Sequence, residues 1–269
     1  MNGSYLIINA FSARNAGDAA IVLATAAVLR ENGAAEIRSA TRYFEQDREF
    51  YAAHNIEVVP PLVPFAPRPG HGSSRWRVLS FFAGIPIAFA VVALSRFTPA
   101  RARRLAERLK RAGVMELLAA DRVIICGGGY LYSARGALNL TLVHVILSTK
   151  LSQLARKGPL MMPQSVGPLP RHLDRVLVSW GFSKVRPIVA RDEIAYREAR
   201  EILPSAGADI HVCPDIPFVR WPSSRPSGSP ETQKARVGIV AMDWTWARRV
   251  DRRDALDRYV AKLADVARA

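Results

Sequence analysis

The chain has 269 residues, of which 49% are hydrophobic and 23% are charged. This composition excludes disordered, collagen-like and polytopic membrane proteins, and the length suits one large domain with part of a second. Its 38 Lys and Arg residues against 23 Asp and Glu residues give a formal net charge of +15. Such an excess favours an anionic partner, which could be a nucleic acid, a membrane surface or a phosphorylated substrate.

Short apolar runs alternate with segments of helical length along the chain. Strands are predicted at residues 5–10, 36–40, 56–59, 123–126, 160–164, 188–190, 210–213 and 237–241. Helices are predicted at residues 16–31, 99–118, 138–156, 173–182, 193–203 and 253–267. Strands with little polar alternation, separated by helices, indicate a parallel sheet that is covered on both faces. We therefore expect an α/β fold with a doubly wound, mostly parallel sheet.

The segment 221–235 has the composition of a linker, with three Pro, four Ser and one Gly. We therefore expect residues 1–220 to form an N-terminal α/β domain and residues 236–269 to begin a second α/β domain. One strand and one helix cannot bury their own apolar faces, so this second domain is expected to be incomplete. Cys126 and Cys213 have neither metal-site spacing nor a disulfide framework, and no signal peptide is recognisable, which favours a cytoplasmic location.

The basic residues gather beside one apolar run. Between Arg68 and Arg111 there are ten basic residues and one acid, a local net charge of +9. The apolar run 79–95 contains Gly84 and Pro86, and its 17 residues fall short of the roughly 20 needed to span a bilayer. It is either a core helix joined to a solvated basic helix, or an interfacial helix that residues 75–111 hold at the inner face of an anionic membrane. A nucleic-acid partner is not expected, because the segment lacks interleaved aromatic residues and any known binding motif.

Ligands of open α/β sheets bind beyond the carboxyl ends of the strands, so residues that bind a ligand are expected in the loops that follow the strands. Asn15, Gly17 and Asp18 open the helix after the first strand. Asn15 can cap this helix and Asp18 can return a hydrogen bond to the backbone of Asn15, which is a purely structural interpretation. The alternative is that the helix N-terminus offers backbone donors to an anion or a sugar hydroxyl, with Gly17 allowing close approach.

Gly127, Gly128 and Gly129 follow a buried strand. Three glycines cost conformational entropy and contribute no packing, so close approach of the backbone to a ligand explains them better than a turn alone. As a phosphate motif the run is weak. Gln164 and Ser165 end another strand and could bond to sugar hydroxyls, although turn chemistry explains them as well.

Two further loops carry charged residues. Asp192 follows a strand and is expected to cap the next helix, with Glu193 in the first turn. Arg191 has no role in capping the helix. Its planar guanidinium suits binding of a ligand carboxylate or phosphate, and the alternative is an ion pair with Asp192 or Glu193. Asp215 stands at a strand end between two prolines that stiffen its loop.

The succession NAGDAA, CGGGYL, PQSVGP, VARDE and CPDIPF, each after a strand, resembles the signatures of the polysaccharide pyruvyl transferase family. The resemblance covers roughly residues 5–245. It implies a GT-B-like fold with the active site between two domains. It also implies transfer of a pyruvyl group from phosphoenolpyruvate to two hydroxyls of one sugar, as a cyclic ketal, in a cell-surface or exopolysaccharide precursor that is a glycan or a lipid-linked sugar.

The resemblance implies a role for each matched residue. Arg191 is expected to act in catalysis by binding phosphoenolpyruvate. The residues expected to bind substrate are Asn15, Gly17, Asp18, Gly127, Gly128, Gly129, Gln164, Ser165, Asp192 and Asp215. No metal or organic cofactor is implied beyond phosphoenolpyruvate as co-substrate.

The chain also departs from the family pattern. The basic and histidine residues of the family's second domain, and its general acid, have no counterpart that we can match, which implies a truncated copy of doubtful independent activity. His144 lies in an apolar helix, where a packing role is expected. The alternative function is that of a GT-B-type glycosyltransferase-like protein, or of a non-catalytic module that binds a sugar or nucleotide sugar.

Overall fold

The computed structural model describes residues 3–63, 75–133, 139–204 and 209–219, and for residues 75–82 it describes the backbone alone. The predicted linker at 221–235 and the predicted second domain at 236–269 lie outside these residues. The strands are β1 (Gly3–Ala10), β2 (Ala34–Thr41), β3 (Glu57–Val59), β4 (Arg122–Ile125), β5 (Gly128–Leu131), β6 (Leu160–Val166), β7 (Ile188–Ala190) and β8 (Ile210–Val212). The helices are α1 (Ala16–Glu31), α2 (Phe44–Ala52), α3 (Arg75–Ser95), α4 (Pro99–Arg108), α5 (Ala112–Ala119), α6 (Leu140–Leu154), α7 (His172–Phe182), α8 (Glu193–Ile202) and α9 (Ile216–Val219).

The strands pair in the order β3-β2-β1-β4-β6-β7-β8, with β5 paired to β6. Every strand pair in the described residues is parallel. The chain runs outward from β1 through β2 to β3, and then returns to continue on the other side of β1 from β4 onward. The predicted α/β fold with a doubly wound parallel sheet is therefore confirmed, and the order of the strands reverses between β1 and β4.

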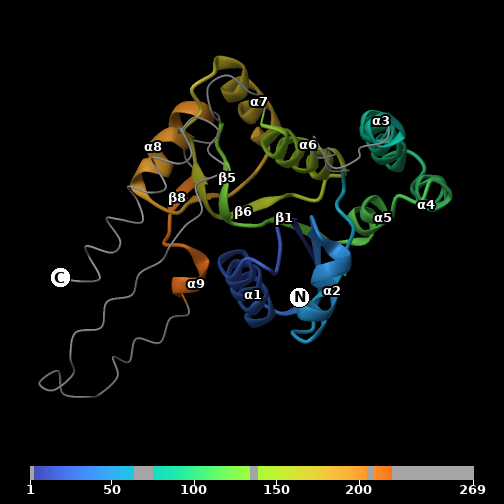
Figure 1. Ribbon diagram of the computed structural model, residues 1–269, viewed down its shortest axis with the longest axis horizontal. Coiled ribbons are helices and arrows are strands. Elements are labelled where there is room, and N and C mark those ends of the chain that lie inside the picture. The colour runs from blue at the N-terminus through green and yellow to red at the C-terminus, as the bar shows by residue number, and fades with distance from the viewer. Residues whose placement is uncertain (1–2, 64–74, 134–138, 205–208, 220–269) are drawn as a thin grey trace, which may run out of the picture. The chain divides into compact units, whose positions relative to one another are not determined.

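The sheet is apolar on both faces because buried residues alternate between two cores along each strand. Leu6 belongs to the core that includes residues of α3 to α8, whereas Ile7 belongs to the core that includes residues of α1 and α2. Ile125 and Ile124 divide in the same way on β4. In Figure 1, α1 and α2 lie below the sheet as drawn, and α6 and α7 lie above it.

The segment predicted as one helix at 99–118 is two helices, so that prediction was wrong. α4 ends at Arg108 and α5 begins at Ala112, and between them Lys110 takes a left-handed φ of 51°. Gly113 then lies so close to the carbonyl oxygen of Pro60 that an added Cβ would come within 2.5 Å of it. This contact brings the start of α5 against the chain that follows β3.

The apolar run 79–95 forms most of α3. Val91 and Val92 of this helix are buried in the larger core, whereas Pro86 and Ala90 are exposed. A core role is thus confirmed for one side of the helix. Within the described ranges, no helix combines the length and the apolar character that are needed to cross a bilayer.

Candidate functional site

The loop from β1 to α1 begins with an unusual backbone conformation. Asn9 has a φ of 64°, in the left-handed region that asparagine tolerates better than most residues, and its side chain is buried. The carboxylate of Asp47, which is 0% exposed, accepts hydrogen bonds from the amide of Ala13 at 3.0 Å and the hydroxyl of Ser12 at 3.3 Å. Asp47 on α2 therefore holds this loop in place.

Asn15 caps α1, as predicted. Its Oδ1 accepts a hydrogen bond from the amide of Gly17 at 3.0 Å. The amide of Asn15 itself donates to the carbonyl oxygen of Ser12, so the predicted return bond from Asp18 to this amide is wrong. Since the cap occupies the Gly17 amide, Gly17 has no backbone donor to offer a ligand while the cap is in place.

The side chain of Asp18 contacts a residue of β5 that is 112 positions away in the sequence. The hydroxyl of Tyr130 on β5 donates a hydrogen bond to the Asp18 carboxylate. Burial raises the pKa of Asp18 above its ordinary value, and the hydrogen bonds from Tyr130 and Asn15 offset part of this rise. Burial and the neighbouring carboxylate of Asp18 also raise the pKa of Tyr130. The pair is thus a half-buried carboxylate held by a phenol that stays protonated.

Aromatic rings pack beside this pair. The ring of Phe11 stacks on that of Tyr130, with centroids 5.4 Å apart, and meets the edge of Tyr43 at 6.0 Å. The guanidinium of Arg42 lies 5.2 Å from the centroid of Phe11 and 5.6 Å from that of Tyr43. Arg42, which follows β2, therefore packs against the Phe11 ring that stacks on Tyr130.

The three glycines have three different environments. A Cβ on Gly127 would lie 2.4 Å from the carbonyl oxygen of Pro163, so this glycine lets β6 approach the end of β4. Gly128 has a φ of 129°, a backbone conformation that residues other than glycine rarely adopt. Gly129 is exposed, and nothing lies within 4 Å of an added Cβ. Packing explains the glycine at 127 and backbone geometry explains the glycine at 128. Among the three, only Gly129 leaves space for the predicted close approach of a ligand to the backbone.

Gln164 lies beside the glycine run on β6. It is opposite Gly128 in the strand register and is 2% exposed. Its amide nitrogen donates weakly to the carbonyl oxygen of Ser165 at 3.3 Å, and Ser165 is half-buried. The backbone carbonyl oxygen of Gln164 accepts a hydrogen bond from the backbone amide of Arg191. This bond connects β6 to the loop after β7.

Arg191 lies between two carboxylates. Its Nε is 3.7 Å from Asp192 Oδ2 and its Nη1 is 3.8 Å from Asp215 Oδ2, which are ion-pair distances beyond hydrogen-bonding range. The guanidinium makes no hydrogen bond to any of the described residues, and the side chain is 39% exposed. Asp192 caps α8 as predicted, by accepting from the amide of Ala195 at 2.7 Å. Arg191 thus retains its full set of donors beside two acids.

These residues form one continuous row along the carboxyl edge of the sheet. Asp18 contacts Tyr130 on β5, β5 pairs with Gln164, and the backbone of Gln164 bonds to Arg191, which faces Asp215. In the part of the chain that the structure describes, no three His, Cys, Asp or Glu side chains lie close enough to hold a metal ion. His144 is buried in α6 and its ring contacts the hydroxyl of Ser148, so its environment is that of a packed core residue.

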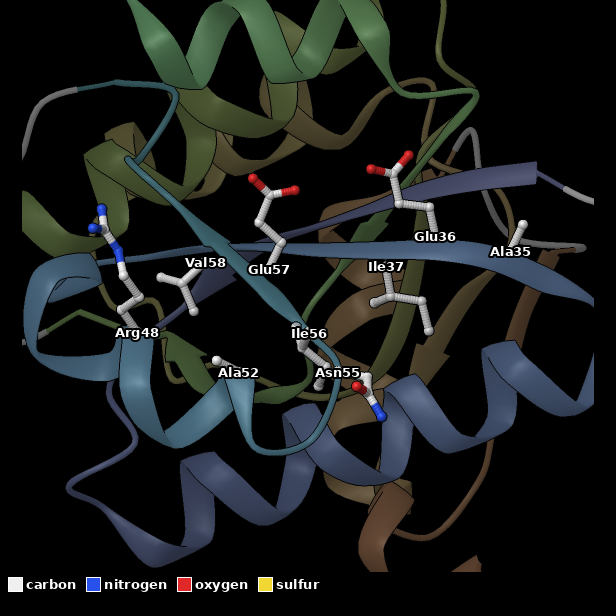
Figure 2. A pocket seen from close by; sticks show the side chains of 9 residues that line it. All are labelled: Ala35, Glu36, Ile37, Arg48, Ala52, Asn55, Ile56, Glu57 and Val58. Carbon is white, nitrogen blue, oxygen red and sulfur yellow. The ribbon is translucent and has the colours of Figure 1, made fainter.

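A cavity elsewhere contains none of these residues. Figure 2 shows this cavity of about 560 Å³ beside β2, β3 and α2, where the carboxylates of Glu36 and Glu57 point to the same side of the sheet. It lies along the edge strand of the sheet, and the row at the carboxyl ends of the central strands is separate from it.

Sequence reasoning missed four residues at this edge: Asn9, Phe11, Arg42 and Tyr130. Tyr130 follows the glycine run directly and could have been considered there, but its partner Asp18 is 112 positions away. Arg42 has no sequence signal, because a single arginine after a strand is common on protein surfaces.

Two comparisons with known proteins bear on identity. No curated protein matches the chain. The family model described as polysaccharide pyruvyl transferase matches residues 15–267, which is nearly the whole sequence and includes every residue of the row described above. The chain therefore belongs to the polysaccharide pyruvyl transferase family.

Proposed function

We propose that this protein transfers a pyruvyl group from phosphoenolpyruvate to a sugar of a cell-surface or exopolysaccharide precursor, forming a cyclic ketal and releasing phosphate. Membership of the polysaccharide pyruvyl transferase family is the observation that carries the proposal. The proposed acceptor is a glycan or a lipid-linked sugar. The proposed location is the cytoplasm, a reducing compartment that suits the two free cysteines, Cys126 and Cys213.

The proposed reaction makes three demands on the site. Protonation of the methylene carbon of phosphoenolpyruvate leaves an oxocarbenium-like centre on the adjacent carbon, and one sugar hydroxyl attacks this centre and loses its proton. The bond to the phosphate oxygen then breaks, phosphate leaves with the electron pair, and a second hydroxyl of the same sugar attacks, loses its proton and closes the ring. The site must therefore bind two anionic groups, supply a proton to carbon and accept protons from the hydroxyls.

Arg191 serves the first demand for one of the two anionic groups. Its guanidinium donates no hydrogen bond within the described residues, so the planar set of donors is available to a carboxylate or a phosphate. Asp192 and Asp215 hold it by charge alone at 3.7 and 3.8 Å. We assign Arg191 to phosphoenolpyruvate binding, and the two acids to positioning it and contacting the sugar.

Asp18 meets the third demand. A carboxylate whose pKa is raised by burial is a stronger base than an exposed one, which suits the removal of a proton from a sugar hydroxyl. Tyr130 fixes the direction of this carboxylate through its hydroxyl. We assign Asn15, Gln164, Ser165 and the backbone of Gly129 to sugar orientation, since nothing within the described residues lies within 4 Å of an added Cβ at Gly129.

The proposal is tested by following phosphate release from phosphoenolpyruvate with phosphorus NMR, with and without lipid-linked or free glycan acceptors. Release is expected only when a suitable acceptor is present. Arg191→Gln is expected to lower the rate about 100-fold, because it removes a donor to the reacting anion. The matched control is Arg200→Gln on α8, which changes an exposed arginine whose contact is the ring of Tyr196; its rate should equal that of the unmodified protein.

Absence of phosphate release with every glycan lipid and nucleotide sugar tried would contradict the proposal. A rise in melting temperature with a nucleotide sugar, together with none with phosphoenolpyruvate, would instead support a sugar-binding module without transferase activity.

A further inference from the structure

A second cavity, of about 390 Å³, lies where the ends of α6 and α7 meet α3. Four cationic side chains and no carboxylate line it, in the set Phe89, Arg96, Lys150, Gln153, Leu154, Arg156, Trp180 and Lys184. α6 ends before β6 begins and α7 ends before β7 begins, so this cavity is at the amino edge of the sheet. It is therefore distinct from the row of Asp18 and Arg191 at the carboxyl edge.

One of the four cations is explained by the fold. The ammonium of Lys150 donates to the carbonyl oxygen of Trp180 at 3.1 Å and lies 4.7 Å from the centroid of its ring. Cations are favourable near helix C-termini, and Trp180 belongs to the last turn of α7. Burial, and to a smaller extent the charge of Lys184, lower the pKa of Lys150 below its ordinary value.

The other three cations have no such explanation. The side chains of Arg96, Arg156 and Lys184 make no hydrogen bond or ion pair with any of the described residues. Like charges gathered in a concave site repel one another, and an anion bound among them removes this repulsion. The charge of the cavity lining therefore favours an anionic group over a neutral or cationic one.

A basic helix surface adjoins the cavity through Arg96, which follows α3 and precedes α4 by three residues. Seven basic residues and one acid lie between Arg96 and Arg111. α4 buries two alanines and exposes Arg101, Arg104 and Arg108. In Figure 1, α3 and α4 lie together at the right of the view.

Exposed apolar residues stand among these cations. Phe97 is 83% exposed, and Leu105 and Leu109 of the same segment are 36% and 41% exposed. Trp180 at the cavity is 45% exposed. Cationic side chains mixed with exposed Phe, Leu and Trp are typical of surfaces that lie in the headgroup region of a bilayer, where rings enter the acyl boundary.

We propose that this face binds the surface of an anionic lipid bilayer, with a headgroup phosphate held by Arg96, Arg156 and Lys184, and with Phe97 inserted below the headgroups. The mixture of charge and apolar exposure favours lipid over a free phosphate, to which Phe97 and Leu105 offer nothing. The inference does not depend on pyruvyl transfer chemistry. It places the anionic contact at the edge of the sheet opposite the proposed site.

Flotation of the full chain with lipid vesicles tests the inference. The protein is expected to float with vesicles of phosphatidylcholine mixed with phosphatidylglycerol, and not with phosphatidylcholine alone. Arg156→Gln and Lys184→Gln are each expected to weaken the vesicle affinity about fivefold, the effect of about 1 kcal/mol for one charge near an anionic surface. Arg104→Gln on α4 should have a similar effect.

Two further variants separate this surface from unspecific charge. Phe97→Ala should weaken vesicle binding even at raised ionic strength, because insertion of a ring is not screened by salt. Arg200→Gln, an exposed arginine on α8, should leave vesicle affinity unchanged. Circular dichroism melts of all variants should match that of the unmodified protein, so that loss of binding is not loss of fold.

Four results would overturn the inference. They are absence of binding to anionic vesicles at low salt, equal binding to neutral vesicles, equal weakening by Arg200→Gln and Arg156→Gln, and calorimetric binding of inorganic phosphate or an oligonucleotide by a protein that does not float. The last result would assign the cavity to a soluble anion or a nucleic acid.

Discussion

Asp18 is a carboxylic acid whose environment opposes its charge. Burial is the largest influence on its pKa and raises it, while hydrogen bonds from Tyr130 and Asn15 act in the opposite direction. Two residues that the sequence separates by 112 positions therefore set the proton affinity of this group jointly.

Removing the phenol should raise the pKa of Asp18 further, because the hydrogen bond from Tyr130 favours the ionised carboxylate. Carbon NMR titration of the labelled side chain is expected to show a higher midpoint in Tyr130→Phe than in the unmodified protein. Tyr132→Phe, an exposed tyrosine two positions on, is the control and should leave the midpoint unchanged. A lower midpoint in Tyr130→Phe would contradict the assigned pair.

Asp18→Asn should raise the free energy of unfolding at pH 7. The pKa of Asp18 is higher in the folded protein than its ordinary value of 3.8, so ionisation is less favourable in the fold than in the unfolded chain. The resulting destabilisation is present above the folded pKa and disappears as the pH falls below 3.8. Urea unfolding at pH 7 and at a pH below 3.8 measures the difference in unfolding free energy between the variant and the unmodified protein. A variant that is less stable than the unmodified protein at pH 7 would contradict this expectation.

The strands β4 and β5 act together as one strand with a break at Cys126 and Gly127. Both parts pair with β6, first at Leu160 and Met161 and then at Gln164 and Val166. The glycine run therefore belongs to the sheet. Gly127 packs closely against β6, whereas Gly129 is exposed and has free space beside it.

Gly127→Ala should destabilise the fold strongly, whereas Gly129→Ala should not. The first Cβ would lie 2.4 Å from a backbone oxygen of β6 that cannot move without breaking the sheet, while the second meets nothing within 4 Å. We expect a loss of about 1–3 kcal/mol or more for Gly127→Ala in urea unfolding, as for other overpacked sites. In the proposed reaction, Gly129→Ala should retain the melting temperature and raise the KM for the acceptor. Equal stability of the two variants would contradict the packing argument.

Prediction of elements from the sequence succeeded where the signals are local. α1 has the bounds that were expected, because Asn15 and the apolar run that follows define a capped helix. α2 was missed, since four of its nine residues are charged and the buried Asp47 gives no sign of its position. β5 was missed because glycines rarely indicate a strand, and its pairing depends on β6.

The described part of the chain has two apolar cores that the sheet separates. Leu151 on α6 belongs to one and Ile56, just before β3, belongs to the other, and both are buried. Coupling between substitutions is weak when the residues share no neighbours.

Leu151→Ala and Ile56→Ala should each lower the free energy of unfolding by about 2–5 kcal/mol, and the double variant should lose close to the sum. Chemical denaturation of the two single variants and the double variant completes the cycle. The pair Leu151→Ala and Val145→Ala, both on α6 in one core, is the comparison and should deviate further from additivity. A large coupling across the sheet would contradict the two-core description.

The sequence alone determined the α/β class, the parallel character of the sheet, the loops that carry the site and the family to which the chain belongs. These follow from apolar periodicity, helix caps and the succession of short motifs, all of which act over a few residues. Only the tertiary structure decided that Tyr130 holds Asp18, that Arg191 keeps its donors free beside Asp215, and that cations at the C-terminal ends of α3, α6 and α7 share one cavity. The energy of a charge or of a buried polar group depends on distances between segments far apart in the chain, and no local pattern specifies those distances.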